Sequence, residues 1–391
     1  MSVVVAARRT WISRAGAGHG AHDETTLAAA VLSACAHDAG ATRTPPGGFA
    51  PAGPLGAAPG RTVEVDEVVL GNAAGHGGDV GRRAALAAFG RHVPGVGVDR
   101  QCASGLAAIT LGAALVDAGQ AATVLAGGVE VAGLAPRRAH GPLDYARASF
   151  APPPWADPDL GVAAEVLARD RGLGRAAQHA VATASHQRVL AAHQAGRLDA
   201  ETVPVGTLAA DEHARALPDA VRARLPGAFT PDGTVTALSA APPADGAAAV
   251  ALVADDARPP GVGGLRLVAT ATVAGVPADA PLAVGAAVRR VCDRAGVGLD
   301  DVGAFEVVEA FAVQVLATGQ DLGVDVVHDP RWNPDGGALG YGHPFGASGA
   351  VAAVRLFARL VRGGAAPGTL GVAAAAAAGG QGVAVLVEVV R

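Results

Sequence analysis

The chain has 391 residues, a net charge of −5 and three cysteines, with half of its residues hydrophobic and 17% charged. This composition excludes a largely disordered chain, and the absence of a basic cluster argues against nucleic-acid binding. Every cationic side chain is arginine, which excludes Schiff-base chemistry on lysine and the GxxxxGK phosphate loop. Cys35, Cys102 and Cys292 are too few and too scattered for a disulfide framework or a zinc site, so we expect no metal.

Apolar segments of the chain are shorter than a membrane span. The apolar stretch 371–378 is far too short to cross a bilayer. At the N-terminus the apolar residues precede the arginines, the reverse of a secretory signal. We therefore expect a cytoplasmic protein without membrane association.

Strand and helix patterns alternate from the N-terminus. We expect strands over 2–7, 65–70, 93–98 and 121–125, and helices over 25–39, 82–89 and 104–118. The Pro- and Gly-rich segment 44–61 has no periodicity and is expected to be an exposed loop. Strands that are apolar on both faces and alternate with helices indicate an α/β fold whose sheet is covered on both sides.

The second half of the chain repeats this plan. Residues 102–105 read CASG and residues 346–349 read GASG, each before an apolar helix. The Ala-Gly-Gly triplets at 126–128 and 378–380 follow at a similar offset, and the strand pattern 264–273 matches the opening strand. A duplicated α/β unit is the simplest explanation, although matches also arise by chance in a chain so rich in Ala and Gly.

The two motifs contain one candidate nucleophile and one candidate base. Cys102 follows a strand and precedes an apolar helix, where the helix N-terminus favours the thiolate; the alternative is a buried structural cysteine. His343 lies in a glycine-dense stretch, where it can act as a base or an oxyanion donor; the alternative is a histidine in a turn before Pro344. If the repeats are related by a pseudo-twofold axis, these two side chains face each other.

Several segments resemble the motifs of the thiolase superfamily, in matching order. VDRQCASGLAAI (98–109) is similar to the nucleophile motif, and GGALGYGHPFGASGA (336–350) to the catalytic-histidine block. AGGVEV, SHQRVLAA, DEHAR, DGTVTA, VEAFA and GGQGVAV also match family segments, so the resemblance covers nearly the whole chain.

The resemblance implies a five-layer αβαβα fold of two similar halves, each with a mixed five-stranded sheet. It implies an N-terminal half at 1–130 plus 233–260, a CoA-binding loop domain at 131–232 and a C-terminal half at 261–391. It also implies a homodimer or homotetramer, and a CoA or acyl-carrier-protein thioester as substrate with no further cofactor.

The resemblance also implies roles for individual residues. Cys102 would be the acylated nucleophile, His343 the base, and the backbone at Gly380 an oxyanion donor. Tyr341 is a weaker catalytic candidate, because its hydroxyl could donate to an oxyanion, although packing on its neighbours is the simpler interpretation. The expected substrate-binding residues are Ser185, Arg188, Arg215, Ala241 and Phe311, where surface exposure is the simpler interpretation for the arginines.

Three departures from the family pattern affect the expected chemistry. Ala376 replaces the second cysteine, which in the family moves the proton at the α-carbon. Val308 replaces the asparagine of NEAFA, and Ala241 replaces a serine that meets the pantetheine chain. Loss of a positioned acid–base group costs roughly 10²–10⁴ in rate.

Three functions remain open at this stage. The first is an acyltransferase that passes an acyl group through Cys102 and forms or cleaves a carbon–carbon bond. The second is acyl transfer to an amine, alcohol, thiol or water, which the residues Ala376 and Val308 favour. The third is a non-catalytic partner subunit that binds acyl-CoA, which the retained Cys102 and His343 motifs disfavour.

Overall fold

The computed structural model describes residues 1–40, 64–136, 138–140, 143–145, 147–258 and 261–391, with the backbone alone for 138–140 and 143–145. The expected loop 44–61 lies outside the described residues. Within these ranges no helix is long and apolar enough to cross a membrane.

The first half of the chain forms a mixed five-stranded sheet with three helices. Its strands are β1 (Ser2–Thr10), β3 (Glu67–Gly71), β4 (Gly95–Val98), β5 (Thr123–Val131) and β9 (Ala244–Ala254), with the short β2 (Ser13–Arg14) at one side. Its helices are α1 (Glu24–Asp38), α2 (Val80–Phe89) and α3 (Ser104–Asp117), preceded by the 3-10 turn η1 (Gln101–Ala103). The strand order is β1-β9-β5-β3-β4, in which β3, β4 and β5 run parallel. The expected elements of this half are confirmed, although their ends differ by up to six residues, since β5 runs to Val131 where the strand was expected to end at 125.

The second half repeats the order of elements. Its strands are β10 (Gly264–Ala274), β11 (Val302–Val307), β12 (Leu370–Ala377) and β13 (Gln381–Val390). Its helices are α7 (Ala283–Ala295), α8 (Ala312–Leu322), α9 (Ala338–Tyr341) and α10 (Phe345–Phe357), with the shorter turns η4 (Asp255–Ala257), η5 (Pro277–Leu282), η6 (Leu299–Asp301) and η7 (Ala358–Arg362). In the described residues this sheet has four strands rather than five, in the order β11-β12-β13-β10. On the side of β11 away from β12, the described residues form an isolated parallel bridge between Phe305 and Trp332.

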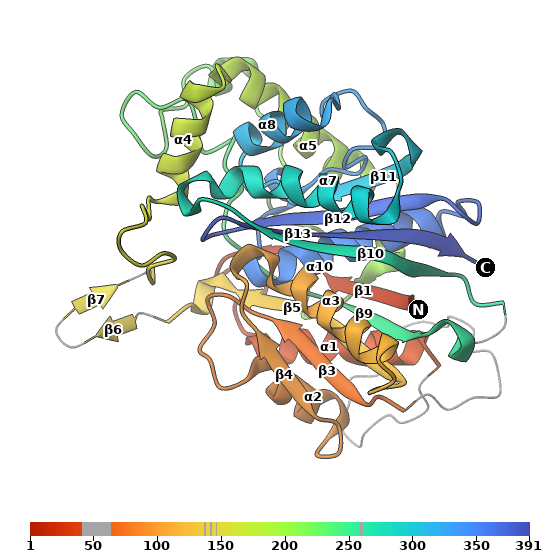
Figure 1. Ribbon diagram of the computed structural model, residues 1–391. Coiled ribbons are helices and arrows are strands. Elements are labelled where there is room, and N and C mark those ends of the chain that lie inside the picture. The colour runs from red at the N-terminus through yellow and green to blue at the C-terminus, as the bar shows by residue number, and fades with distance from the viewer. Residues whose placement is uncertain (41–63, 137, 141–142, 146, 259–260) are drawn as a thin grey trace.

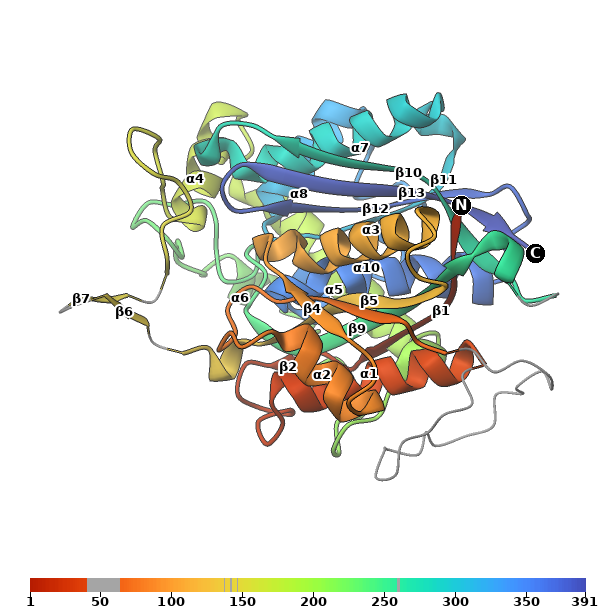
Figure 2. The same ribbon diagram turned by 60° about the horizontal axis from the view of Figure 1, so that its bottom comes forward.

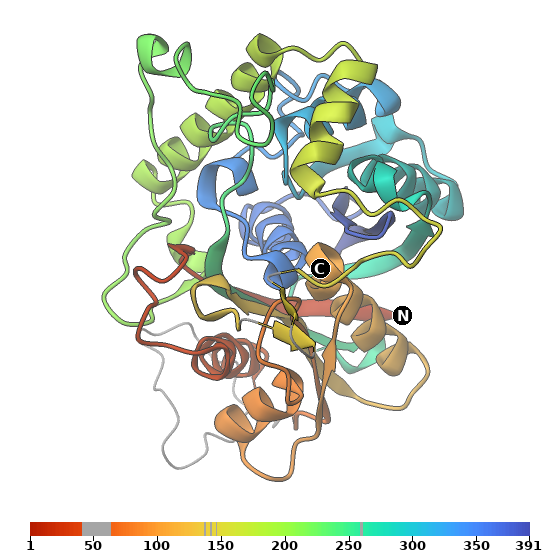
Figure 3. The same ribbon diagram turned by 90° about the vertical axis from the view of Figure 1, so that its left-hand side faces the viewer.

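The segment between the repeats is largely helical and lies at one end of the molecule. It contains η2 (Ala132–Leu134), β6 (Arg138–His140), β7 (Leu143–Tyr145), α4 (Leu160–Asp170), α5 (Arg175–Gln194), η3 (Asp199–Glu201), β8 (Thr202–Val203) and α6 (Asp219–Arg222). Helices α4 and α5 pack on α8 of the second half. Viewed from that end, they lie on the side of the second half (Figure 3).

The two halves stack as five layers. Helices α1 and α2 cover the outer face of the first sheet, α3 and α10 lie between the sheets, and α7 and α8 cover the outer face of the second sheet (Figures 1 and 2). Strands β1 and β10 pair antiparallel at Val3 and Val4, which joins the sheets along one border. The expected αβαβα arrangement is confirmed, and only the strand count of the second sheet differs.

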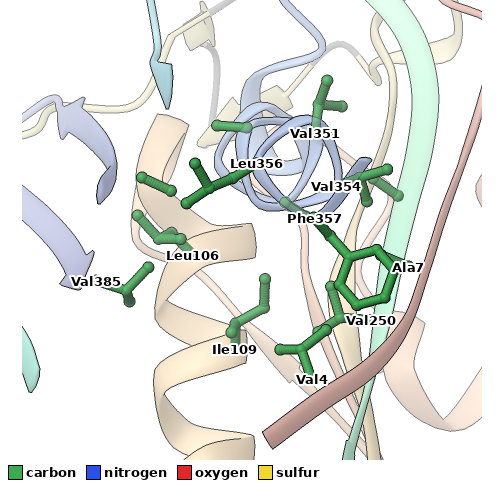
Figure 4. Close-up of a cluster of buried hydrophobic side chains, with 14 of the residues drawn as sticks. Val4, Ala7, Leu106, Ile109, Val250, Val351, Val354, Leu356, Phe357 and Val385 are labelled. Atoms are coloured by element: carbon green, nitrogen blue, oxygen red, sulfur yellow. The ribbon is translucent and has the colours of Figure 1, made fainter. Parts of the chain in front are cut away.

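Small residues allow the two central helices to cross closely. A Cβ added to Gly105 of α3 would lie 2.7 Å from the carbonyl oxygen of Gly346, and one added to Gly349 would lie 2.8 Å from the Cβ of Leu106. The matching CASG and GASG motifs therefore meet where α3 and α10 cross. Beside this crossing the helices bury branched side chains against both sheets, as Figure 4 shows for Ile109, Val351 and their neighbours.

A buried ionic network joins the middle segment to β1 and α10. The Arg9 guanidinium contacts Glu201 at 2.7 Å and Asp211 at 2.8 Å. Arg355 of α10 contacts Glu201 and Asp335, each at 2.6 Å. Glu201 therefore lies between two buried cations from different halves of the fold.

Replacing Glu201 with alanine is expected to destabilise the protein by about 3–5 kcal/mol, because both guanidinium groups stay buried without this partner. The exposed pair Arg169–Asp170 offers a matched control. Asp170→Ala is expected to cost less than about 1 kcal/mol. Urea unfolding of the two variants measures the difference, and equal midpoints would contradict the structural role of Glu201.

Candidate active site

Cys102 lies in a tight turn between β4 and α3. Gln101 adopts a left-handed conformation with φ of 49°, and its backbone N–H donates to Asp99 at 2.8 Å. The Ser104 hydroxyl accepts from the Arg100 N–H at 2.7 Å and donates to the Gln101 carbonyl at 2.6 Å. These local bonds fix the turn that presents the Cys102 thiol.

Two cavities meet at Cys102. The smaller, of about 30 Å³, is apolar and is also lined by Phe311, Gln314 and Ala376. The larger, of about 480 Å³, is lined by Ala73, Ala74, Asp99, Gln101, Arg147, Ala148, Phe150, Asp159 and Phe345. Leu160 and Ala378 line both cavities. The thiol therefore has space beside it for an acyl group.

The resting thiol of Cys102 is protonated. Burial raises the pKa of Cys102 to about 12, and the nearby carboxylate of Glu130 acts in the same direction. This corrects the expectation that the helix N-terminus would yield a thiolate, since burial and the acidic neighbours dominate. Removal of the proton must therefore accompany attack on a substrate.

His343 is a buried neutral base close to this site. Burial lowers its pKa to about 4, so the imidazole can accept a proton near neutral pH. Its Nδ1 bonds the Ser348 hydroxyl at 2.7 Å, and its Nε2 has no hydrogen-bond partner in the described part of the chain. The Phe345 ring, which lines the larger cavity, stands 5.2 Å from the imidazole centroid. His343 itself lines neither cavity, so direct pairing with Cys102 stays a prediction.

Ser348 was missed by the sequence reasoning, although it lies in the GASG motif. It is fully buried on the first turn of α10, next to His343 in space. Its hydroxyl fixes the orientation of the imidazole and leaves Nε2 free to take a proton.

Ser348→Ala is expected to slow acyl transfer by about tenfold, because an imidazole without its Nδ1 partner loses orientation. Ser2→Ala is a suitable control, since Ser2 is buried and its hydroxyl has no partner within the described ranges. Steady-state rates of both variants test this. An unchanged rate for Ser348→Ala would show that Ser348 does not orient the His343 imidazole for acyl transfer.

The other predicted catalytic residues lie at different distances from Cys102. Gly380 has a φ of 77° in the β12–β13 turn and lines neither cavity, whereas Ala378 lines both. Ala378 is therefore the residue of this turn that shares both cavities with Cys102, and the oxyanion role of the Gly380 backbone stays a prediction. Tyr341 is buried in the central hydrophobic cluster and lines neither cavity, and burial strongly raises its pKa. This position favours packing over proton transfer for Tyr341.

Two of the predicted substrate-binding residues make internal hydrogen bonds. The Ser185 hydroxyl donates to Glu309 at 2.6 Å and accepts from the Gly337 N–H at 3.0 Å. The Arg188 guanidinium donates to the carbonyls of Val327 and Trp332. Both side chains therefore hold segments of the second half together, and their contact with substrate stays a prediction.

The remaining three predicted binding residues lie in three different places. Phe311 lines the small cavity. The Ala241 N–H donates to the carbonyl of Ala310, the residue before Phe311, at 3.0 Å. Arg215 is exposed and lines a separate hollow of about 50 Å³ with His186 and other residues.

Of the three departures noted in the sequence, one lies at a cavity that Cys102 lines. Ala376 lines the small cavity with Cys102, so the position of the missing thiol faces the nucleophile. Val308 is buried and its N–H donates to the Ala374 carbonyl at 2.9 Å. Cys35 and Cys292 are buried and line neither cavity, so neither supplies a second thiol.

The class of protein is indicated by a layered α/β fold in which a half-buried Cys102 and a buried His343 lie at the two matching motifs, a combination suited to acyl transfer. Family models of the thiolase N-terminal and C-terminal domains match residues 54–256 and 264–389. The chain therefore belongs to the thiolase family, and it is an acyltransferase.

Named relatives agree with this assignment. The chain is 38% identical over 334 residues to a putative acetyl-CoA C-acetyltransferase, YhfS, of Bacillus subtilis, covering 83% of this chain and 88% of the relative. It is 37% identical to an acetyl-CoA acetyltransferase of Pseudomonas aeruginosa, covering 88% and 96%. The crystal structure of the Bacillus anthracis acetyl-CoA acetyltransferase matches with a TM-score of 0.86 and 29% identity, covering 100% and 98%.

Proposed function

We propose that the protein transfers an acyl group from a CoA thioester through an acyl-Cys102 intermediate and forms or cleaves a carbon–carbon bond. The observation that carries this is the position of Cys102 at two cavities. The Phe345 ring lines the larger cavity with Cys102, and its centroid lies 5.2 Å from that of the neutral His343 imidazole. In this proposal His343 takes the thiol proton, the sulfur attacks the thioester carbonyl, and the CoA thiolate leaves with that proton. The backbone N–H groups near Cys102 and Ala378 would stabilise the oxyanion.

We also propose that the middle segment 131–232 holds the CoA. Arg215, Arg222 and His186 line one hollow, and guanidinium groups pair well with phosphate. Phe311 and Leu160 line the small cavity at Cys102, where a pantetheine chain would end. The same cationic hollow would accept the phosphopantetheine of an acyl carrier protein, which is the alternative donor.

A second candidate function has its own support. Ala376 carries only a methyl group where an acid–base group would serve carbon chemistry. Without that group, His343 is better suited to deprotonate an amine, alcohol, thiol or water than an α-carbon. Acyl transfer to such an acceptor is therefore the alternative to carbon–carbon bond chemistry.

We further propose a cytoplasmic homodimer or homotetramer that needs no metal or other cofactor. The exposed edge strand β4, where Val96 is 45% exposed, supports pairing with a second copy. Analytical ultracentrifugation tests the oligomeric state.

Acceptor competition tests the proposed function. The enzyme is incubated with acetyl-CoA, and acetoacetyl-CoA formation is compared with CoA release in the presence of amines, alcohols and water. Acetoacetyl-CoA as the main product supports carbon–carbon chemistry, whereas CoA release with an acylated amine or alcohol supports the alternative. No Cys102-dependent turnover with any donor or acceptor would contradict both.

A further inference from the structure

Glu130 is a buried carboxylate that joins the two halves of the fold. It lies one residue before the end of β5 and is fully buried. Its two oxygens accept four N–H groups, from the Asn72 side chain at 3.1 Å and from the backbone of Ala73 at 3.0 Å, Ala74 at 3.1 Å and Gly346 at 2.9 Å. Three of these donors come from the first half of the chain and one from the second.

The donors belong to segments that form the site. Ala73 and Ala74 line the larger cavity at Cys102. Gly346 lies on the first turn of α10, between Phe345, which lines that cavity, and Ser348, which holds His343. A Cβ on Gly346 would lie 2.7 Å from the Cα of Asn72, so the two segments are in contact. Glu130 therefore fixes the histidine-bearing turn against the wall of the nucleophile cavity.

The charged side chains around Cys102 are mostly acidic. The carboxylates of Glu130 and Asp99 act on the thiol of Cys102, and Asp159 and Arg147 line the larger cavity with it. Arg147 is engaged by Asp157 at 3.0 Å, which offsets its charge at the cavity. Burial raises the pKa of Glu130 to about 7, with Glu24 acting in the same direction and its backbone donors against it. Glu24 in turn pairs with His76 at 3.3 Å. Above neutral pH the Glu130 carboxylate is thus charged, accepts all four donors and raises the pKa of the thiol.

We infer that Glu130 is a positioning residue with two effects. It sets the placement of the His343 turn relative to Cys102 across the two halves. Its charge is held directly behind the cavity wall of Ala73 and Ala74, which Cys102 shares, and there it disfavours a thiolate at Cys102 until a thioester is bound and His343 removes the proton. The first effect rests on the proposed function, whereas the second concerns the thiol alone.

The variants Glu130→Gln and Glu130→Asp separate the charge from the geometry. Glutamine keeps the size but removes the charge, and aspartate keeps the charge but shortens the reach. Asp66→Asn is the matched control, since Asp66 also accepts backbone N–H groups, from Ala122 and Thr123, and lines neither Cys102 cavity. Each folded protein is assayed for acetyl transfer and for iodoacetamide alkylation of Cys102 at pH 8, measured by peptide mass spectrometry.

For Glu130→Gln we expect acetyl transfer to fall by about tenfold to a hundredfold in kcat with little change in KM. We expect Cys102 alkylation to become about tenfold faster, which corresponds to a fall of one unit in the thiol pKa. Glu130→Asp is expected to lose acetyl transfer while its Cys102 is alkylated at the wild-type rate. Asp66→Asn is expected to match the wild type in both assays.

If Cys102 in Glu130→Gln is alkylated at or below the wild-type rate, the inferred charge effect is overturned. A purely structural role of Glu130 would not make alkylation of the thiol faster. A wild-type kcat in Glu130→Asp would overturn the positioning role. This test remains valid even if Glu130→Gln does not fold. If the wild type itself is not acylated by acetyl-CoA, the proposed function fails, and the alkylation rates still decide the effect of Glu130 on Cys102.

Discussion

His343→Ala is expected to slow acylation of Cys102 by a factor of about 10²–10⁴. The thiol is protonated in the resting site, since burial raises its pKa to about 12, and it reacts only if a base removes the proton. His343 is neutral near pH 7, and its Nε2 has no hydrogen-bond partner among the described residues. Rapid-quench measurement of CoA release from acetyl-CoA gives the acylation rate directly.

A matched variant distinguishes this effect from general damage to the fold. His37→Ala removes a half-exposed histidine from α1, on the outer face of the first sheet, and is expected to keep the wild-type rate. Circular dichroism confirms that both variants are folded. A folded His343→Ala protein that is acylated within threefold of the wild-type rate would exclude His343 as the base.

Ala376→Cys is expected to increase carbon–carbon bond formation by up to about 10²-fold. Residue 376 lines the small cavity beside Cys102, so a thiol there would face the acyl group. This thiol could move the proton at the α-carbon of a second acetyl-CoA, which leaves His343 to serve Cys102. Acetoacetyl-CoA formation from acetyl-CoA measures the gain.

Ala376→Ser provides the control for this gain of function. A hydroxyl has almost the size of the thiol but a much higher pKa, so it is expected to give no increase. Equal rates for the cysteine variant and the wild type would show that Ala376 does not limit carbon chemistry. An increase in both variants would indicate a change in packing instead of proton transfer.

Much of the fold could be predicted from the sequence because local patterns determine it. The alternation of apolar strands and helices and the repeated CASG and GASG motifs predict two α/β halves, and the structure shows these motifs at the crossing of α3 and α10. Among the described residues the second sheet has four strands where five were expected, and an isolated bridge between Phe305 and Trp332 forms at the edge beside β11. Strand pairing of this kind depends on tertiary contacts that a residue pattern does not contain.

The site was predicted only in part, for a related reason. Cys102 is identified by its own motif, but the burial that raises its pKa comes from distant segments. Ser185 and Arg188 were expected to meet substrate, yet their partners Glu309 and Trp332 lie more than a hundred residues away in the chain. A charged residue at the end of an apolar strand, Glu130, was the one local signal of the link between the halves.

Intact-protein mass spectrometry after mixing with acyl-CoAs tests the central claim most directly. Wild-type protein, Cys102→Ala and His343→Ala are each mixed with acetyl-CoA and with longer acyl-CoAs, quenched in acid and weighed. We predict one acyl group per wild-type chain, located on Cys102, none on Cys102→Ala and a much slower adduct on His343→Ala. An equal adduct on Cys102→Ala, or none on the wild type with any donor, would contradict an acyl-Cys102 intermediate formed from acyl-CoA.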